Sequence, residues 1–152
     1  MLCLMKLISK SMADTQKIAK ILMEKITPKT VKRAATVLAL EGELGAGKTV
    51  LVKALGRALG IKKPMTSPTF VLMKCYKLKT INYKLLYHID AYRLKDHQDL
   101  EALGIKEILK EPGNLVLIEW AERVKKLVPK NAVWIHIDHI GDKVRGVIIN
   151  EG

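Results

Sequence analysis

Cysteine is scarce in this 152-residue sequence, and long apolar runs are missing from it. Its two cysteines, Cys3 and Cys75, offer neither a disulfide framework nor the spacing of a metal site, which suits a reducing compartment. No apolar stretch approaches the roughly 18 residues that a membrane-spanning helix needs. The segment from Met1 to Met5 is followed by Lys6 and lacks the long apolar centre of a secretory signal. The composition therefore predicts a globular protein of the cytoplasm.

Acidic residues are absent between Leu44 and Ile89, a stretch that is rich in lysine. The whole chain carries 27 basic and 15 acidic residues, a net charge of +12. A field of this sign attracts nucleotides, RNA or the acidic face of a protein. Lysine outnumbers arginine 22 to 5, however, which also fits a general lysine bias, and few aromatic residues are present to stack on bases. Direct contact with RNA is therefore left open.

One glycine-rich stretch has the spacing of a phosphate-binding loop. It fits G-x-x-x-x-G-K-[ST] and consists of Gly42, Glu43, Leu44, Gly45, Ala46, Gly47, Lys48 and Thr49. An apolar run typical of a buried strand precedes it, and apolar residues at helical spacing follow as far as Leu59. This context favours a phosphate loop over a plain glycine turn. In such a loop, main-chain N–H groups bind phosphate oxygens, Lys48 reaches the outer phosphates and Thr49 binds Mg²⁺.

Two acidic residues are expected at the carboxyl ends of strands, where α/β proteins place the groups that face a ligand. Asp90 ends one apolar strand and is a candidate for handling water or Mg²⁺, with a helix cap or an ion pair with Arg93 as alternatives. Glu119 follows four apolar residues that are typical of a buried parallel strand. Beside a phosphate loop, such an acid orients Mg²⁺ or its waters. Trp120 comes next, and packing in the core is the simplest interpretation of it.

The remaining pattern predicts one α/β domain over residues 1–152. A helix is expected from the Ser11-x-x-Asp14 capping box to Pro28, with Thr15 in its first turn. The other predicted elements are a hairpin over 70–78 and 81–90, short helices over 96–103 and 105–109, a helix over 121–128, and a hairpin over 132–140 and 144–149. Together with the strand and helix around the phosphate loop, they predict a single-domain, P-loop NTPase-like fold. Its central sheet is expected to be mostly parallel, with antiparallel hairpins and flanking helices.

Four motifs occur in a characteristic order within this short chain. They are Gly42 to Thr49, Ser67-Pro68-Thr69-Phe70, His88-Ile89-Asp90-Ala91-Tyr92-Arg93 and Leu117-Ile118-Glu119-Trp120. In this combination they resemble the TsaE family, the bacterial ATPase of tRNA threonylcarbamoyladenosine synthesis. The resemblance implies a P-loop α/β fold that binds ATP and Mg²⁺. It also implies TsaD- and TsaB-like partners, with which the family modifies the adenosine next to the anticodon of tRNA.

The resemblance further implies roles for individual residues. The Mg²⁺ ligands of the family match Thr49 and Glu119, and its catalytic or switch acid matches Asp90. Residues near the nucleotide match Thr15 and Trp120. The Ser-Pro-Thr-Phe motif matches a segment that behaves as a switch.

The predicted activity is ATP hydrolysis, in which water attacks the terminal phosphate in line with the leaving group. Lys48 and Mg²⁺ would neutralise the developing charge, while Asp90 or Glu119 places the water. A small-molecule kinase is the runner-up, but such kinases generally need several arginines around the transferred group, and this chain has five in all. A nucleotide-gated assembly factor with little turnover is a third possibility. For a guanine-nucleotide switch, the sequence lacks the Asn-Lys-x-Asp motif that reads guanine.

No arginine has an obvious place at the terminal phosphate. Arg57 is expected on the far turn of the helix after the loop, and Arg145 on a distant hairpin. An added cation raises phosphate-loop hydrolysis about 10³ to 10⁵-fold. Slow hydrolysis is therefore expected of the chain alone, with faster turnover in an assembly.

Overall fold

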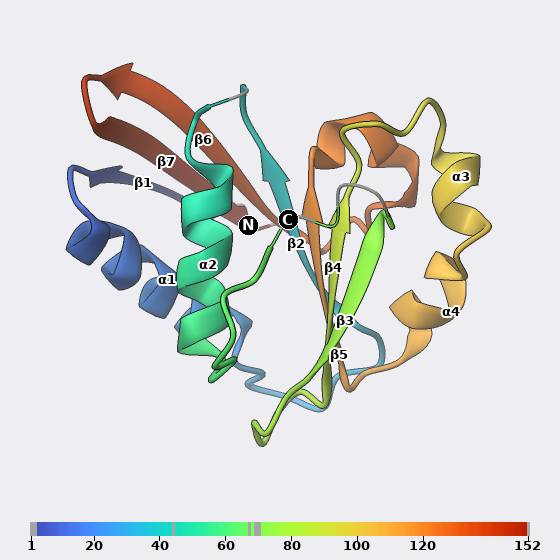
Figure 1. The fold of residues 1–152 in the computed structure, drawn as a ribbon. Coiled ribbons are helices and arrows are strands. Elements are labelled where there is room, and N and C mark those ends of the chain that lie inside the picture. Colours follow the sequence, from blue (N-terminus) through green and yellow to red (C-terminus); the bar gives the residue numbers. More distant parts are fainter. Residues whose placement is uncertain (1–2, 44, 67, 69–70, 152) are drawn as a thin grey trace.

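One mixed β-sheet runs through the computed structural model, which describes residues 3–43, 45–66, 68 and 71–151 (Figure 1). Its seven strands lie in the order β1-β7-β6-β2-β5-β4-β3. They are β1 (Cys3–Ser9), β2 (Thr36–Glu41), β3 (Met73–Lys77), β4 (Leu85–Asp90), β5 (Asn114–Glu119), β6 (Val133–Gly141) and β7 (Val144–Glu151). The four central strands, β6, β2, β5 and β4, pair in parallel, and the outer pairings are antiparallel. The predicted parallel centre with antiparallel hairpins is confirmed.

Helices cover both faces of the sheet (Figure 1). They are α1 (Met12–Ile26), α2 (Lys48–Ala58), α3 (His97–Glu101), α4 (Ile105–Lys110) and the 3₁₀ helix η1 (Ala121–Leu127). Side chains alternate along β2, so that Leu38 and Leu40 join the apolar core under α1 and α2. Val37 and Ala39 join the second core under α3, α4 and η1. Within the described residues, no helix is both long enough and apolar enough to cross a membrane.

Strand β1 is an element that the sequence analysis did not predict. It pairs antiparallel with β7 along its whole length, with Cys3 opposite Glu151 and Ser9 opposite Arg145. Met5 and Leu7 pack against the core on the α1 side. The residues that make this segment a strand are therefore more than 130 positions away in the chain, where no local pattern reveals them.

The expected helix boundaries are mostly confirmed, with one correction. The Ser11 side chain accepts a hydrogen bond from the Asp14 N–H at 3.1 Å, and the Asp14 carboxylate accepts one from the Lys10 N–H at 2.9 Å, which caps α1. The segment predicted as a helix over 121–128 is instead a 3₁₀ helix with a kink at Val124. Ala121 and Val124, three residues apart, are both buried, and side chains at this spacing share one face of a 3₁₀ helix.

Candidate functional site

The carboxyl ends of three parallel strands meet at one edge of the sheet. Register places Leu40 of β2 opposite Glu119 of β5, and Glu119 opposite Asp90 of β4. The phosphate loop begins immediately after β2, so the loop and the two acids lie at the same edge. This is the arrangement that the sequence predicted for ligand-facing groups in an α/β protein.

Two glycines of the loop occupy positions that leave little room for a side chain. Gly42 has φ of 144°, and a Cβ there would overlap the main-chain oxygen of Ile137 in β6. Gly47 has φ of 102°, and a Cβ there would lie 3.1 Å from Nε of Arg145. Both conformations belong to the region that favours glycine. Leu44, also predicted as a loop residue, lies outside the described residues.

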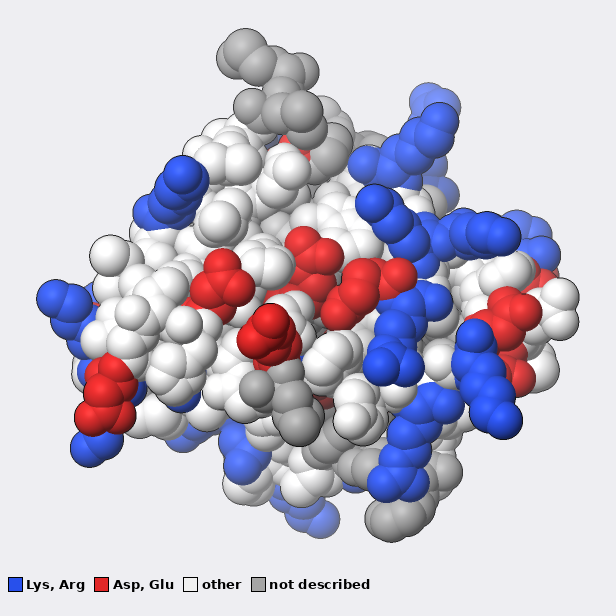
Figure 2. Space-filling model, turned by 90° about the horizontal axis from the view of Figure 1, so that it is seen from above, with Lys and Arg blue, Asp and Glu red and all other residues white. Residues whose placement is uncertain are grey.

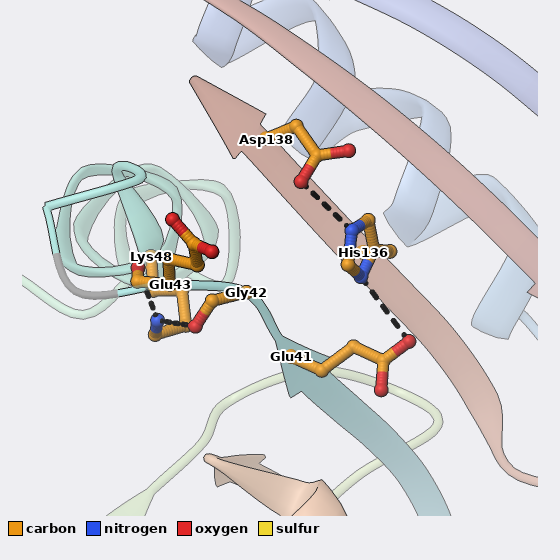
Figure 3. Close-up of polar contacts among 6 residues, drawn as sticks. All are labelled: Glu41, Gly42, Glu43, Lys48, His136 and Asp138. Atoms are coloured by element: carbon orange, nitrogen blue, oxygen red, sulfur yellow. Dashed lines mark hydrogen bonds and ion pairs between the residues drawn. The ribbon is translucent and has the colours of Figure 1, made fainter.

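Lys48, the first residue of α2, is folded back onto its own loop (Figure 3). Its Nζ donates hydrogen bonds to the main-chain oxygens of Gly42 and, at 2.8 Å, of Glu43. The same Nζ lies 3.9 Å from the centre of the Trp120 ring, within the range of a cation–π contact. The side chain is buried, and burial lowers the pKa of Lys48, while nearby carboxylates, Glu122 foremost, act in the opposite direction.

A cavity of about 400 Å³ lies beside this lysine. It is lined by Gly45, Gly47, Lys48, Thr49, Val50, Asp90, Tyr92, Glu119, Trp120 and Arg145. The structure thus brings together the predicted lysine, hydroxyl and both acids. Thr15 is not among the lining residues: its hydroxyl lies 2.8 Å from that of Ser9 and donates to the Ser11 carbonyl. Ala46 is buried in the core, so it serves the loop through its main chain.

Trp120 forms part of an aromatic wall of the cavity. It adopts a left-handed conformation with φ of 58°, which turns the chain sharply after β5. Its ring lies 4.9 Å from that of Tyr92, and the guanidinium group of Arg123 lies 5.2 Å from Tyr92 and 5.6 Å from Trp120. Trp120 is partly buried and packs against the core as well as lining the cavity. The interpretation of Trp120 as a core residue therefore covers only part of its surroundings.

Glu119 is held by a histidine that the sequence analysis did not place in the site. Nε2 of His88 donates to Oε2 of Glu119 at 2.7 Å, and both side chains are buried. Within the described residues, Nδ1 of His88 has no hydrogen-bond partner. The sequence does contain a signal for this placement, because side chains alternate between the two faces of a strand. His88 and Asp90 are two residues apart and therefore share one face of β4. At the end of the strand, the Asp90 carboxylate accepts a hydrogen bond from the Tyr92 N–H at 3.0 Å.

Arg145 corrects an expectation from the sequence. It was expected on a distant hairpin, but it lines the cavity and lies against Gly47. The reason is the strand order, because β6 pairs with β2 and brings the β6–β7 hairpin next to the phosphate loop. Arg57 lies elsewhere, in a smaller basic cavity on the outer side of α2, as expected.

A second polar cluster joins the start of the loop to β6. His136 lies between two carboxylates, with Nδ1 3.2 Å from Glu41 and Nε2 2.9 Å from Asp138 (Figure 3). Viewed onto this edge of the sheet, acidic side chains extend across the middle of the surface, with lysine and arginine gathered mainly to one side (Figure 2). Two carboxylates, those of Asp90 and Glu119, thus belong to residues that line the cavity of a chain whose net charge is +12.

The donor set suits magnesium better than a metal held by protein alone. In the part of the chain that the structure describes, no three His, Cys, Asp or Glu side chains are grouped to hold a metal ion. Magnesium at a nucleotide site takes one or two protein oxygens and completes its shell with phosphates and water. Thr49 and Glu119 both line the cavity, and their hydroxyl and carboxylate oxygens fit that requirement.

The fold and the loop together define a phosphate-loop α/β protein, a P-loop NTPase-like architecture. Comparison with known proteins then identifies the family. The family profile described as "Threonylcarbamoyl adenosine biosynthesis protein TsaE" matches residues 9–147. The chain belongs to the TsaE family, as its four motifs predicted.

Relatives with curated descriptions agree with this assignment. The chain is 33% identical over 127 residues to the "tRNA threonylcarbamoyladenosine biosynthesis protein TsaE" of Haemophilus influenzae, a match over 84% of this chain and 75% of that protein. It is 39% identical over 111 residues to the protein of the same name from Bacillus subtilis, a match over 73% and 66%. Among solved structures, "Crystal structure of Bacillus subtilus YdiB" superimposes with a TM-score of 0.74 at 29% identity, covering 99% of this chain and 87% of that one.

Proposed function

We propose that this chain binds ATP with Mg²⁺ and hydrolyses it as an accessory protein of tRNA threonylcarbamoyladenosine formation. One observation carries the proposal: a single cavity is lined by the phosphate-loop lysine and hydroxyl and by two strand-end carboxylates. Membership of the TsaE family supports the assignment of this activity to tRNA threonylcarbamoyladenosine formation. The activity belongs in the cytoplasm, where tRNA is modified.

The residues divide the work according to their chemistry. Lys48 exchanges its hydrogen bonds to the loop carbonyls for the outer phosphates, which are stronger acceptors because they are charged. Thr49 and Glu119 would hold Mg²⁺, which would shield the phosphate charge from the attacking water. His88 fixes the Glu119 carboxylate. Asp90, at the end of the neighbouring strand, orients the water and accepts its proton.

The base of the nucleotide has a candidate contact in the aromatic wall. Trp120 and Tyr92 both line the cavity, and stacking on an aromatic ring tolerates any base. The preference for ATP over GTP therefore rests on the missing guanine-reading motif and on the family. Thr15 remains a prediction from the resemblance alone.

The partners proposed are TsaD- and TsaB-like proteins, with tRNA reached through their complex. The chain would use ATP to reset this complex between rounds and would not itself modify the base. Direct contact with tRNA is not required for this role.

A phosphate-release assay with ATP, GTP and a panel of small phosphoryl acceptors tests the proposed activity. We expect phosphate release from ATP and no phosphorylated acceptor. Transfer to an acceptor would replace the ATPase by the kinase alternative. A companion assay measures modified adenosine in tRNA after several rounds of synthesis by the partner proteins. Product that stays at a single round with and without this chain would refute the role in tRNA modification.

A further inference from the structure

Arg145 lies against the phosphate loop at Gly47, one of the three glycines of the loop. It is the second residue of β7, opposite Ser9 of β1 and, across the hairpin, opposite His139 of β6. A Cβ built on Gly47 would lie 3.1 Å from its Nε, 3.5 Å from its Cδ and 3.7 Å from its Cγ. The side chain therefore uses the space that glycine leaves, directly before Lys48.

The guanidinium group of Arg145 is not engaged by a carboxylate. Within the described residues it forms no ion pair, and its Nη1 donates a hydrogen bond to the main-chain oxygen of Val144 at 3.5 Å, the outer limit for such a bond. A partly buried guanidinium has five N–H donors in a rigid fork that fits phosphate oxygens. Its position in a cavity with a phosphate loop indicates an anionic ligand for this group.

The other arginines are placed differently. Arg57 lines the basic cavity outside α2 together with Lys53, and Arg33 lines a cavity beside residues 30–37. Arg123 lies over the rings of Tyr92 and Trp120. Of the arginines in the described residues, Arg145 alone lines the phosphate-loop cavity.

We propose that Arg145 is a catalytic residue that contacts the terminal phosphate of a bound nucleoside triphosphate. The inference deepens the function proposed above and rests on it. In the reaction, the water oxygen bonds to the terminal phosphorus, the bond from that phosphorus to the bridging oxygen breaks, and ADP leaves. The proton of the water passes to Asp90 and then to the phosphate product. Arg145 stabilises the negative charge that grows on the phosphate oxygens, so the chain supplies its own arginine to the site.

Calorimetric titration of the full chain with three ligands, each with Mg²⁺, separates this role from simple binding. The ligands are ADP, a non-hydrolysable ATP analogue, and ADP with aluminium fluoride, which mimics the phosphoryl group in transfer. For Arg145→Ala we expect ADP affinity within about twofold of the parent chain and a loss of about 10²-fold or more for the aluminium fluoride complex. The turnover number should fall by a similar factor. Arg145→Lys, which keeps the charge but loses the fork, should be intermediate.

Arg57→Ala is the matched control, because it removes an arginine outside the cavity, and it should leave all three affinities unchanged. Thermal unfolding of each variant shows that the fold is retained. Equal affinity of the parent chain and Arg145→Ala for the aluminium fluoride complex would overturn the inference. An equal loss for ADP would also overturn it, since Arg145 would then act on the nucleotide diphosphate or on the loop. A parent chain that binds none of the three ligands would instead refute the function on which the inference rests.

Discussion

Replacement of the buried Lys48 side chain by a smaller one should cost the fold little stability. Its hydrogen bonds go to two loop carbonyls, and its burial opposes the charged form. We predict that Lys48→Ala abolishes ATP binding and hydrolysis while the midpoint of thermal unfolding stays within a few degrees. Equilibrium binding of ATP and thermal unfolding measure the two effects. Lys53→Ala, an exposed lysine on the same helix, is the control. Parent-like ATP affinity in folded Lys48→Ala would remove this cavity as the nucleotide site.

His88 acts on the site through Glu119 rather than by contact with the nucleotide. Residues that orient a metal ligand typically alter metal affinity by about 10 to 100-fold when they are replaced. We predict that His88→Gln raises the Mg²⁺ concentration needed for half-maximal ATP binding by about tenfold, with little change in Mg²⁺-free affinity. Titration of Mg²⁺ at fixed ATP measures this shift. His97→Gln, in which the replaced histidine lies on α3, is the matched control. Loss of affinity that is equal with and without Mg²⁺ would show that His88 has a purely structural role.

Asp90 and Glu119 are neighbours across two strands, yet their surroundings differ. Glu119 is buried and bonded to His88, whereas Asp90 is less buried and accepts a bond from the main chain of Tyr92. We predict that Glu119→Ala weakens Mg²⁺-dependent ATP binding, and that Asp90→Ala mainly lowers the turnover number, by about 10² to 10⁴-fold. Steady-state kinetics and binding titrations of both variants measure the difference. Reduced affinity with unchanged turnover in Asp90→Ala would reverse the two assignments.

At the scale of the elements, the contact between the phosphate loop and β6 depends on Gly42. This residue combines φ of 144° with a close approach to the main-chain oxygen of Ile137. We predict that Gly42→Ala lowers the free energy of unfolding by about 1 to 3 kcal/mol or more and displaces the loop. Denaturant unfolding measures the change. Gly60→Ala is the matched control, because Gly60 has φ of 82° but no neighbour within 4 Å of a Cβ. Equal losses in the two variants would show that backbone strain alone matters at Gly42.

Some elements can be predicted from the sequence better than others. The difference is the separation, along the chain, of the residues that determine each element. The phosphate loop and its flanking strand and helix follow from spacing within about 25 residues, and the cap at Ser11 follows from a four-residue pattern. Asp90 and Glu119 lie close together because the carboxyl ends of parallel strands meet at one edge of the sheet. This general rule can be applied without knowing the register of the strands. The site of Arg145 depends on β6 pairing with β2, which no local pattern contains.

Strand β1 and the contact of His88 also depend on residues that are distant in the chain. β1 is an edge strand whose pairing partner lies at the opposite end of the chain. His88 was recognised within a motif, but its bond to Glu119 requires the register of β4 against β5. Leu44, Ser67, Thr69 and Phe70 lie outside the described residues, so the predictions on these positions stay predictions.

Across the whole molecule, the cavity is assembled from segments that span more than 100 residues. The loop comes from the first half of the chain, the acids from β4 and β5, Trp120 from the residue after β5, and Arg145 from the C-terminal hairpin. The hairpin reaches the site from an exposed turn, where Ile140 is 57% exposed. A protein that binds the β6–β7 hairpin would therefore contact the element that carries Arg145 without contacting the loop. Binding of a partner would in this way affect the rate of ATP hydrolysis.

The chain alone should accordingly hydrolyse ATP slowly, and TsaD- and TsaB-like partners should accelerate it. Arg145 reaches the loop from the β6–β7 hairpin, so a partner that holds this hairpin in place would strengthen the contact between its guanidinium group and the terminal phosphate. Fixing an arginine at that phosphate is worth up to about 10³ to 10⁵-fold in rate, and we predict at least tenfold acceleration when both partners are present. Phosphate release is measured for the chain alone, with each partner and with both. Lys48→Ala with both partners is the control for contaminating activity. Turnover that is equally fast in the isolated chain would show that the site is complete without its assembly.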